Sequence, residues 1–264
     1  MNILRATFKI KHHEFAAYRS NVYLNFLFGC VPLILSIFLW KAIYGTNIDV
    51  IGGYSYKQMI TYYVIAFLLS NLINVRDNTV KMSELIQNGS IHNFLLKPIR
   101  FFSLNFMLYL AEKLCYFLNI FVPYTVFCLL IRQYLFLNVN SILIFILSVC
   151  LAFVLKYVIG SILGLLTTWV EEISSLLDFW DNIENFLAGG LLPLSILPAS
   201  LYSVVSFLPF KYFLFVPIDI YMGKMQWNEM IGALATQAVW IILLGLLLQI
   251  IKLKAYRKYS GYGN

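Results

Sequence analysis

Long apolar runs separated by short polar segments are the main pattern of the 264-residue chain. A run of about 17 to 25 apolar residues can cross the roughly 30 Å hydrocarbon core of a bilayer as one helix. Because such runs recur from end to end, the sequence predicts a single all-α membrane domain over residues 1–264 with six transmembrane helices. The predicted spans are Val22–Ile43, Gln58–Asn74, a third ending at Ile131, Val139–Val170, Ile173–Leu192 and Met230–Ile251.

The N-terminal residues 1–20 have a different pattern, in which apolar and basic side chains are mixed. Phe8 and Phe15 alternate with Lys9 and Arg19, for example. A helix with this pattern lies in the membrane interface, with its basic side chains among the lipid headgroups. We therefore expect an amphipathic interfacial arm at the N-terminus.

Prolines interrupt the apolar sequence after the fifth predicted span. The pieces between them are too short to cross a bilayer one at a time, and apolar pieces of about ten to fourteen residues are typical of re-entrant or interfacial segments. Residues 193–217 are therefore predicted to form short re-entrant helices on the outer side. The residues that mark this region are Gly190, Pro193, Pro198, Pro209 and Pro217.

Composition and charge support the membrane interpretation and give it an orientation. Hydrophobic residues make up 61% of the chain and charged residues 12%, against about 45–50% and 25% in soluble domains. The net charge is +7. The basic residues cluster at the ends of the spans, as is typical of cytoplasmic loops. They do not form a face that would bind nucleic acid. The N-terminal arm, residues 76–100 and the C-terminal tail hold twelve Lys and Arg residues against five in the opposite loops. Both termini of this multi-pass protein should therefore lie in the cytoplasm.

Motifs for catalysis, nucleotide binding and metal binding are missing from the sequence. An ATPase needs the pattern G-x-x-x-x-G-K-[ST], whose backbone amides bind phosphates, and residues 1–264 do not contain it. The four cysteines show no C-x-x-C spacing, and no H-E-x-x-H or G-x-S-x-G occurs. We therefore predict no catalytic residue, no metal site and no cofactor of its own.

Three acids, Asp178, Asp181 and Glu184, lie within the fifth predicted span. Their spacing places them on one side of a helix, and they have no basic residue beside them in the sequence. Ionisable groups at the bilayer centre are costly and rarely face lipid. Either this helix begins in the cytoplasm and enters the membrane only near Phe186, or its polar side lines a wet translocation cavity or a subunit interface.

Two lysines in or beside other spans are open to more than one interpretation. Lys113, next to Glu112, is interpreted as lying at the interface, where a long side chain can extend to the headgroups. Lys156 is ambiguous in the same way because the register of its span is uncertain.

Two segments and the whole plan of the chain carry a resemblance to a known family. The first segment is SELIQNGSIHNFLLKPI at residues 83–99, and the second is FLAGGLLPLSILPASLYSVVSFLPFKYFLFVPIDIYMGK at residues 186–224. Together with a basic arm, six spans and a short basic tail, they make the chain similar to the permease subunits of bacterial ATP-binding-cassette type-2 exporters. The acids at 178, 181 and 184 are not part of this resemblance.

The resemblance implies that residues 76–100 are the cytoplasmic coupling loop that docks on an ATPase. Met82, Leu85 and Ile86 repeat at helical spacing and could fill a groove on a partner, while Gly89 could end that helix with a left-handed cap. The residues expected to take part in coupling are Met82, Glu84, Leu85, Ile86, Gly89 and Pro98.

The resemblance also implies the partners and the function. Two permeases, identical or homologous, would pair in the bacterial inner membrane, and separate cassette ATPases would bind ATP and Mg and drive alternating access. The cargo, whether drug, peptide or lipid, cannot be read from the sequence. A polytopic membrane enzyme acting on lipid and a non-transporting assembly or immunity protein are the alternatives. The first would require clustered His, Asp or Arg at one membrane face to bind a polar headgroup, and the acid cluster has no His or basic companions in the sequence.

Overall fold

The computed structural model describes residues 3–17, 19–45, 48–88, 101–170 and 173–260. Within them every regular element is a helix, apart from an isolated bridge between Ile51 and Tyr54. The long helices are α2 (Arg19–Tyr44), α3 (Tyr56–Leu72), α6 (Phe101–Leu130), α7 (Ile142–Leu166) and α11 (Trp227–Ser260). The shorter ones are α1 (Ile3–Ala17), α4 (Arg76–Gln87), η1 (Arg132–Tyr134), α8 (Ile173–Leu187), η2 (Leu194–Ile196), α9 (Ala199–Ser206), η3 (Pro209–Tyr212) and α10 (Phe215–Tyr221).

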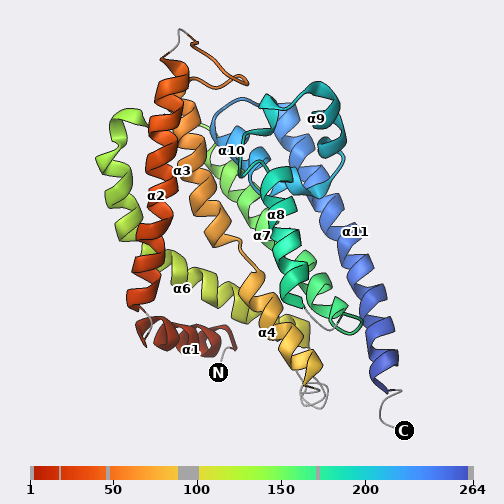
Figure 1. Cartoon of the computed structure of the whole chain (residues 1–264). Coiled ribbons are helices and arrows are strands. Elements are labelled where there is room, and N and C mark those ends of the chain that lie inside the picture. The colour runs from red at the N-terminus through yellow and green to blue at the C-terminus, as the bar shows by residue number, and fades with distance from the viewer. Residues whose placement is uncertain (1–2, 18, 46–47, 89–100, 171–172, 261–264) are drawn as a thin grey trace.

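The helices form a bundle whose two chain ends lie at the same end (Figure 1). We call this the terminal end, and the opposite end, where α9 and α10 lie, the distal end. Five stretches in the described residues are long and apolar enough to span a membrane, and they comprise α2, α3 with α4, α6, α7 and most of α11. The all-α polytopic membrane architecture expected from the sequence is thereby confirmed.

The fifth predicted span differs from the expectation of six long helices. Ile173–Leu192 was expected to cross the membrane, but α8 is a helix of 15 residues that ends at Leu187. At 1.5 Å per residue it is about 22 Å long, less than the roughly 30 Å of a hydrocarbon core. The chain makes this passage from the terminal end toward α9 as α8 followed by a largely non-helical stretch (Figure 1).

Large apolar side chains are exposed along the outside of the bundle. Phe28 on α2, Leu130 on α6 and Leu243 on α11 are examples, and more than half of the first two side chains is accessible. Soluble monomers rarely expose continuous apolar surface on this scale. In a bilayer the same surface is covered by lipid, so the exposure follows from the membrane environment.

Helix α7 is the central element of the bundle because α4, α10 and α11 all pack against it. Its close contact with α4 depends on two glycines one turn apart, Gly160 and Gly164. Thr79 and Met82 of α4 occupy the space where side chains at those positions would be. The two glycines of α7 therefore form a groove in which one side of α4 is buried.

The proline-rich segment folds into the short helices η2, α9, η3 and α10 at the distal end (Figure 1). Pro198 precedes α9 and Pro209 begins η3, positions where proline's missing N–H costs no helical hydrogen bond. Gly189 takes a φ of 84°, which favours glycine, and its carbonyl accepts a hydrogen bond from Tyr62 at 2.7 Å. None of these helices is long enough to cross a bilayer alone.

The N-terminal arm lies across the terminal end as α1, against α6 (Figure 1). Thr7 and Lys11 on α1 are buried, whereas Lys9, Ile10 and His13 are exposed. The predicted amphipathic helix is thus present, with one side covered by the protein.

Candidate functional site

Asp178 and Asp181 on α8 share a single basic partner, Arg76, which is the first residue of α4. The Nη2 atom of Arg76 donates to Asp178 Oδ1 at 2.6 Å, and its Nη1 atom donates to Asp181 Oδ2. The two acids are three residues apart and therefore lie on the same side of α8. The expectation that these acids lack basic companions is wrong, because Arg76 comes from a segment about a hundred positions earlier.

Glu184 forms the most buried ion pair of the site, with Lys156 of α7. Lys156 is 6% exposed, and its Nζ atom donates to Glu184 Oε1 and lies 5.2 Å from the centre of the Phe213 ring. Trp180 donates its Nε1 hydrogen to the other carboxylate oxygen of Glu184 at 3.0 Å. Buried charges persist only when their hydrogen-bonding groups are satisfied in this way. Lys156 is therefore a buried partner within the bundle, which resolves its ambiguous interpretation.

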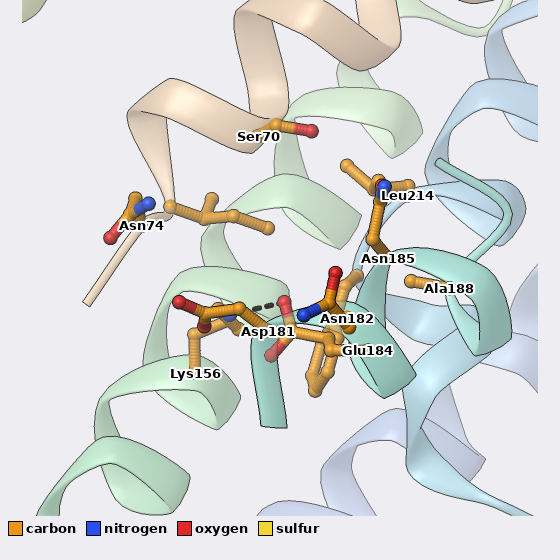
Figure 2. Close-up of a pocket in the computed structure, with 11 residues that line it drawn as sticks. Ser70, Asn74, Lys156, Asp181, Asn182, Glu184, Asn185, Ala188 and Leu214 are labelled. Carbon is orange, nitrogen blue, oxygen red and sulfur yellow. Dashed lines mark hydrogen bonds and ion pairs between the residues drawn. The ribbon is translucent and has the colours of Figure 1, made fainter. Parts of the chain in front are cut away.

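These charged groups surround a pocket of about 320 Å³ between α3, α7, α8 and the segment around Phe213. Figure 2 shows Lys156, Asp181 and Glu184 together at this pocket. Uncharged polar side chains also line it, namely those of Ser70, Asn74, Asn182 and Asn185. Of the three acids hypothesised to line a translocation cavity, Asp181 and Glu184 line this pocket, whereas Asp178, which pairs with Arg76, does not.

Helix α8 is held in place by both ion pairs and apolar packing. Leu177 is its one buried residue, and Ile173, Trp180 and Leu187 pack partly buried against the main core. The ion pairs with Arg76 and Lys156 connect α8 to α4 and α7. Its exposed residues include Asp178, Asn182 and Asn185. Phe179 and Phe186 are also exposed on α8, but its exposed polar groups are not suited to lipid and favour water or another protein as their neighbour.

The predicted coupling residues divide into buried and exposed groups. Met82 and Ile86 are completely buried against α7 and α11, in a cluster with Phe101, Val158, Leu165, Leu248 and Ala255. They therefore cannot enter a groove on a partner as expected, because their groove is in this chain. Glu84 is exposed and Leu85 half-buried, while Gly89 and Pro98 lie outside the described residues.

A second group of charges, not predicted as a unit, gathers around Glu112 of α6. Its carboxylate lies 3.6 Å from Lys11 of α1, 3.5 Å from Lys81 of α4 and 3.6 Å from Lys113. Lys113 is 9% exposed, so its expected extension to the headgroups is wrong. Although burial opposes the charged form of Lys11, its hydrogen bond with Glu14 and the charge of Glu112 raise its pKa. This cluster joins α1, α4 and α6 at the terminal end.

A third polar contact lies at the distal end, between Tyr54 and Asp219 of α10. The Tyr54 hydroxyl donates to Asp219 Oδ1, and Lys224 Nζ lies 3.7 Å from the centre of the Tyr54 ring. Burial raises the pKa of Asp219 to about 6, and the Tyr54 hydrogen bond and the charge of Lys224 oppose this rise. This pair was not predicted, because its members are 165 residues apart.

The fold and these sites define a class of protein: a multi-pass membrane protein whose helices enclose a charged pocket. Within the described residues no group of three or more His, Cys, Asp or Glu residues is placed to hold a metal ion.

Comparison with known families identifies the family to which this membrane protein belongs. Residues 30–263 match the family described as "ABC-2 family transporter protein". Because this match covers most of the chain, the protein belongs to that family and is a transmembrane permease component of an ABC transporter. A search of curated proteins found no match.

Proposed function

We propose that this chain is the permease subunit of an ATP-driven exporter. It would pair with a second permease, identical or homologous, dock on separate ATP-binding-cassette ATPases, and move its cargo outward by alternating access. Family membership supports a permease, and the lack of a phosphate-binding motif in residues 1–264 supports an ATPase on another chain.

The observation that carries the proposal is the charged pocket among membrane helices. Lys156 is the one charged residue of the spanning helix α7, and ionisable groups within spans are costly and commonly mark transport pathways. Asp181 and Glu184 lie at the same pocket. Transport along a polar path between the two ends of the bundle, lined in part by α8, best accounts for these groups.

The exposed side of α4 is the proposed ATPase-docking surface. Lys81, Glu84 and Asn88 are exposed there, near the terminal end (Figure 1). The buried side of α4 packs on α7, and α7 carries Lys156. A displacement of α4 by an ATPase would therefore reach the pocket through α7 directly and through Arg76, which binds α8.

The terminal end is proposed to face the cytoplasm of a bacterial cell, in keeping with the distribution of Lys and Arg. In a chain without its native cysteines, a cysteine at Ser203 on α9 should react with an impermeant maleimide added to intact cells. A cysteine at Glu84 should react only after permeabilisation. Labelling of the Glu84 position in intact cells would contradict this orientation.

The function is tested by purifying the tagged full-length chain from its native host in mild detergent and identifying the proteins that accompany it. We expect a cassette ATPase at stoichiometric amount, and vesicles containing the complex should hydrolyse ATP faster when cargo is present. A preparation without any ATPase, or one in which the chain alone modifies lipid, would contradict the proposal.

A further inference from the structure

The pocket between α3, α7 and α8 is of a size that suits a headgroup. Its volume of about 320 Å³ is at the lower end of the range of about 300–1,000 Å³ for ligand pockets. Ile73, Ala188, Phe213 and Leu214 give its wall an apolar part, beside the polar groups labelled in Figure 2. A small polar group with some carbon surface therefore fits it better than a large cargo would.

The charge of the pocket determines which kind of small polar group it can bind. Its lining contains two carboxylates, Asp181 and Glu184, and one ammonium, Lys156. Arg76 is shared between Asp181 and Asp178, which lies outside the lining, so the lining itself has one carboxylate more than it has ammonium groups. This excess attracts a cation and repels an anion.

The remaining polar groups can complete the coordination of an amine. A carboxylate has about four acceptor positions, and Glu184 uses one oxygen for Lys156 and the other for Trp180, so each oxygen retains accepting capacity. Asn182 and Asn185 are exposed at the pocket, and an amide can both donate and accept. These two amides could form hydrogen bonds with other polar atoms of the ligand that lie near its amine.

Two aromatic side chains are exposed on α8, the helix that carries Asp181 and Glu184. Phe179 is 65% and Phe186 42% exposed. They are seven residues apart, so they lie on the same side of the helix as Asn182, which is between them in sequence. A hydrocarbon chain attached to a headgroup in the pocket could lie along these two rings.

We propose that the pocket binds the cationic, amine-bearing headgroup of an amphiphile, with the ammonium at Asp181 and Glu184 and the apolar chain on Phe179 and Phe186. The inference rests on the proposed permease function and specifies the class of its cargo.

The test uses the full-length complex in phosphatidylcholine nanodiscs and two probes of equal chain length, octylammonium and octanoate. Equilibrium dialysis measures the binding of each, and empty nanodiscs correct for partition into lipid. We expect saturable binding of octylammonium and none of octanoate. Asp181→Asn should weaken octylammonium binding by about tenfold or more, the usual effect of losing a charge-assisted hydrogen bond.

Asp178→Asn is the matched control, because it removes the same charge from the same helix outside the pocket lining. It should change binding by less than about twofold, the scale of an exposed charge. The double variant Lys156→Met/Glu184→Leu replaces the buried pair with apolar residues, which preserves folding more reliably than a single change, and should weaken binding about tenfold or more.

Three results would overturn the proposal: octanoate binding as tight as that of octylammonium, equal effects of the two aspartate variants, or no binding above empty nanodiscs. Retained binding in the double variant would overturn the assignment to Glu184. The outcome is separable from that of the permease function. If a cassette ATPase accompanies the chain but octylammonium does not bind, the cargo class is wrong and the permease function stands.

Discussion

Thr79 of α4 donates its hydroxyl hydrogen to the main-chain carbonyl of Gly160 on α7, across 3.2 Å. This contact requires the absence of a side chain at position 160. A Cβ atom built there would lie 2.6 Å from Val75 Cγ2 and 2.7 Å from Thr79 Oγ1. At the start of α4, the junction between α4 and α7 thus depends on Gly160.

Gly160→Ala should therefore destabilise the protein by about 1–3 kcal/mol, the usual cost of overpacking a core. Gly232→Ala on α11 is the matched control, because nothing lies within 4 Å of its added Cβ. The control should be neutral or slightly stabilising, since alanine favours helix over glycine. Thermal unfolding in detergent measures both. Equal melting temperatures for the two variants would show that α4 does not depend on the glycine.

The pair of Lys156 and Glu184 should respond differently to single and double substitution. Glu184→Gln leaves a buried ammonium without its counter-ion and should cost about 3–5 kcal/mol, whereas Lys156→Met/Glu184→Leu should be nearly neutral or stabilising. Melting temperatures of the three proteins in detergent provide the comparison. A single variant as stable as the wild type would mean that water reaches this pair freely.

Exposed and buried residues of α4 should give separable defects. Glu84→Lys should leave the permease folded but reduce the coupling of ATP hydrolysis to transport, because Glu84 is exposed on the proposed docking surface. Met82→Ala should instead lower stability by about 2–5 kcal/mol, as expected for a buried methionine. Co-purified ATPase, hydrolysis and transport are measured for each variant. Normal transport by Glu84→Lys would exclude this residue from coupling.

Asp219 should make stability depend on pH. Its pKa is about 6 in the folded chain, above its ordinary value of 3.8, so the folded state binds more protons than the unfolded state between these values. Its contribution is therefore fully present below about pH 4 and is lost as pH rises through about 6. The loss is about 3 kcal/mol, at 1.36 kcal/mol for each pH unit between the two pKa values.

The measurement is thermal unfolding between pH 4 and 8, for the wild type and for Asp219→Asn. The variant has no carboxylate to titrate at this position, so its stability should vary less across the range. An unchanged pH profile would indicate that Asp219 is not the group responsible. Glu229→Gln, which removes an exposed carboxylate at the start of α11, controls for a general loss of negative charge.

The spanning helices were predictable because the bilayer imposes a length and an apolar composition on each one. Residues 22–43, for instance, lie within α2 and residues 230–251 lie within α11. The arm at α1 was predictable from its alternation of apolar and basic residues. Both features depend on residues that are close together in the sequence, so they can be predicted without knowing the tertiary contacts.

The candidate site was only partly predictable because its partners are distant in sequence. The three acids on α8 stood out, but nothing near them indicated Arg76 or Lys156. The spacing of Met82 and Ile86 correctly indicated one apolar side of a helix. It could not indicate that the matching groove lies on α7. That groove is formed by glycines, and a glycine in the sequence does not show which helix packs against it.

The dependence of α8 on ion pairs has a consequence for how the protein is made. A segment with three acids and 15 residues is a poor substrate for insertion by hydrophobicity alone, since each aspartate near the centre of a helix opposes insertion by about 2.5–3.5 kcal/mol. Arg76 and Lys156, however, are synthesised first and can already be in the membrane when α8 emerges from the ribosome. We therefore expect α8 to enter the bilayer late and by assembly onto α4 and α7. Nascent chains arrested after α8 should become resistant to protease in this segment when Arg76 and Lys156 are present, and remain sensitive when both are replaced by alanine.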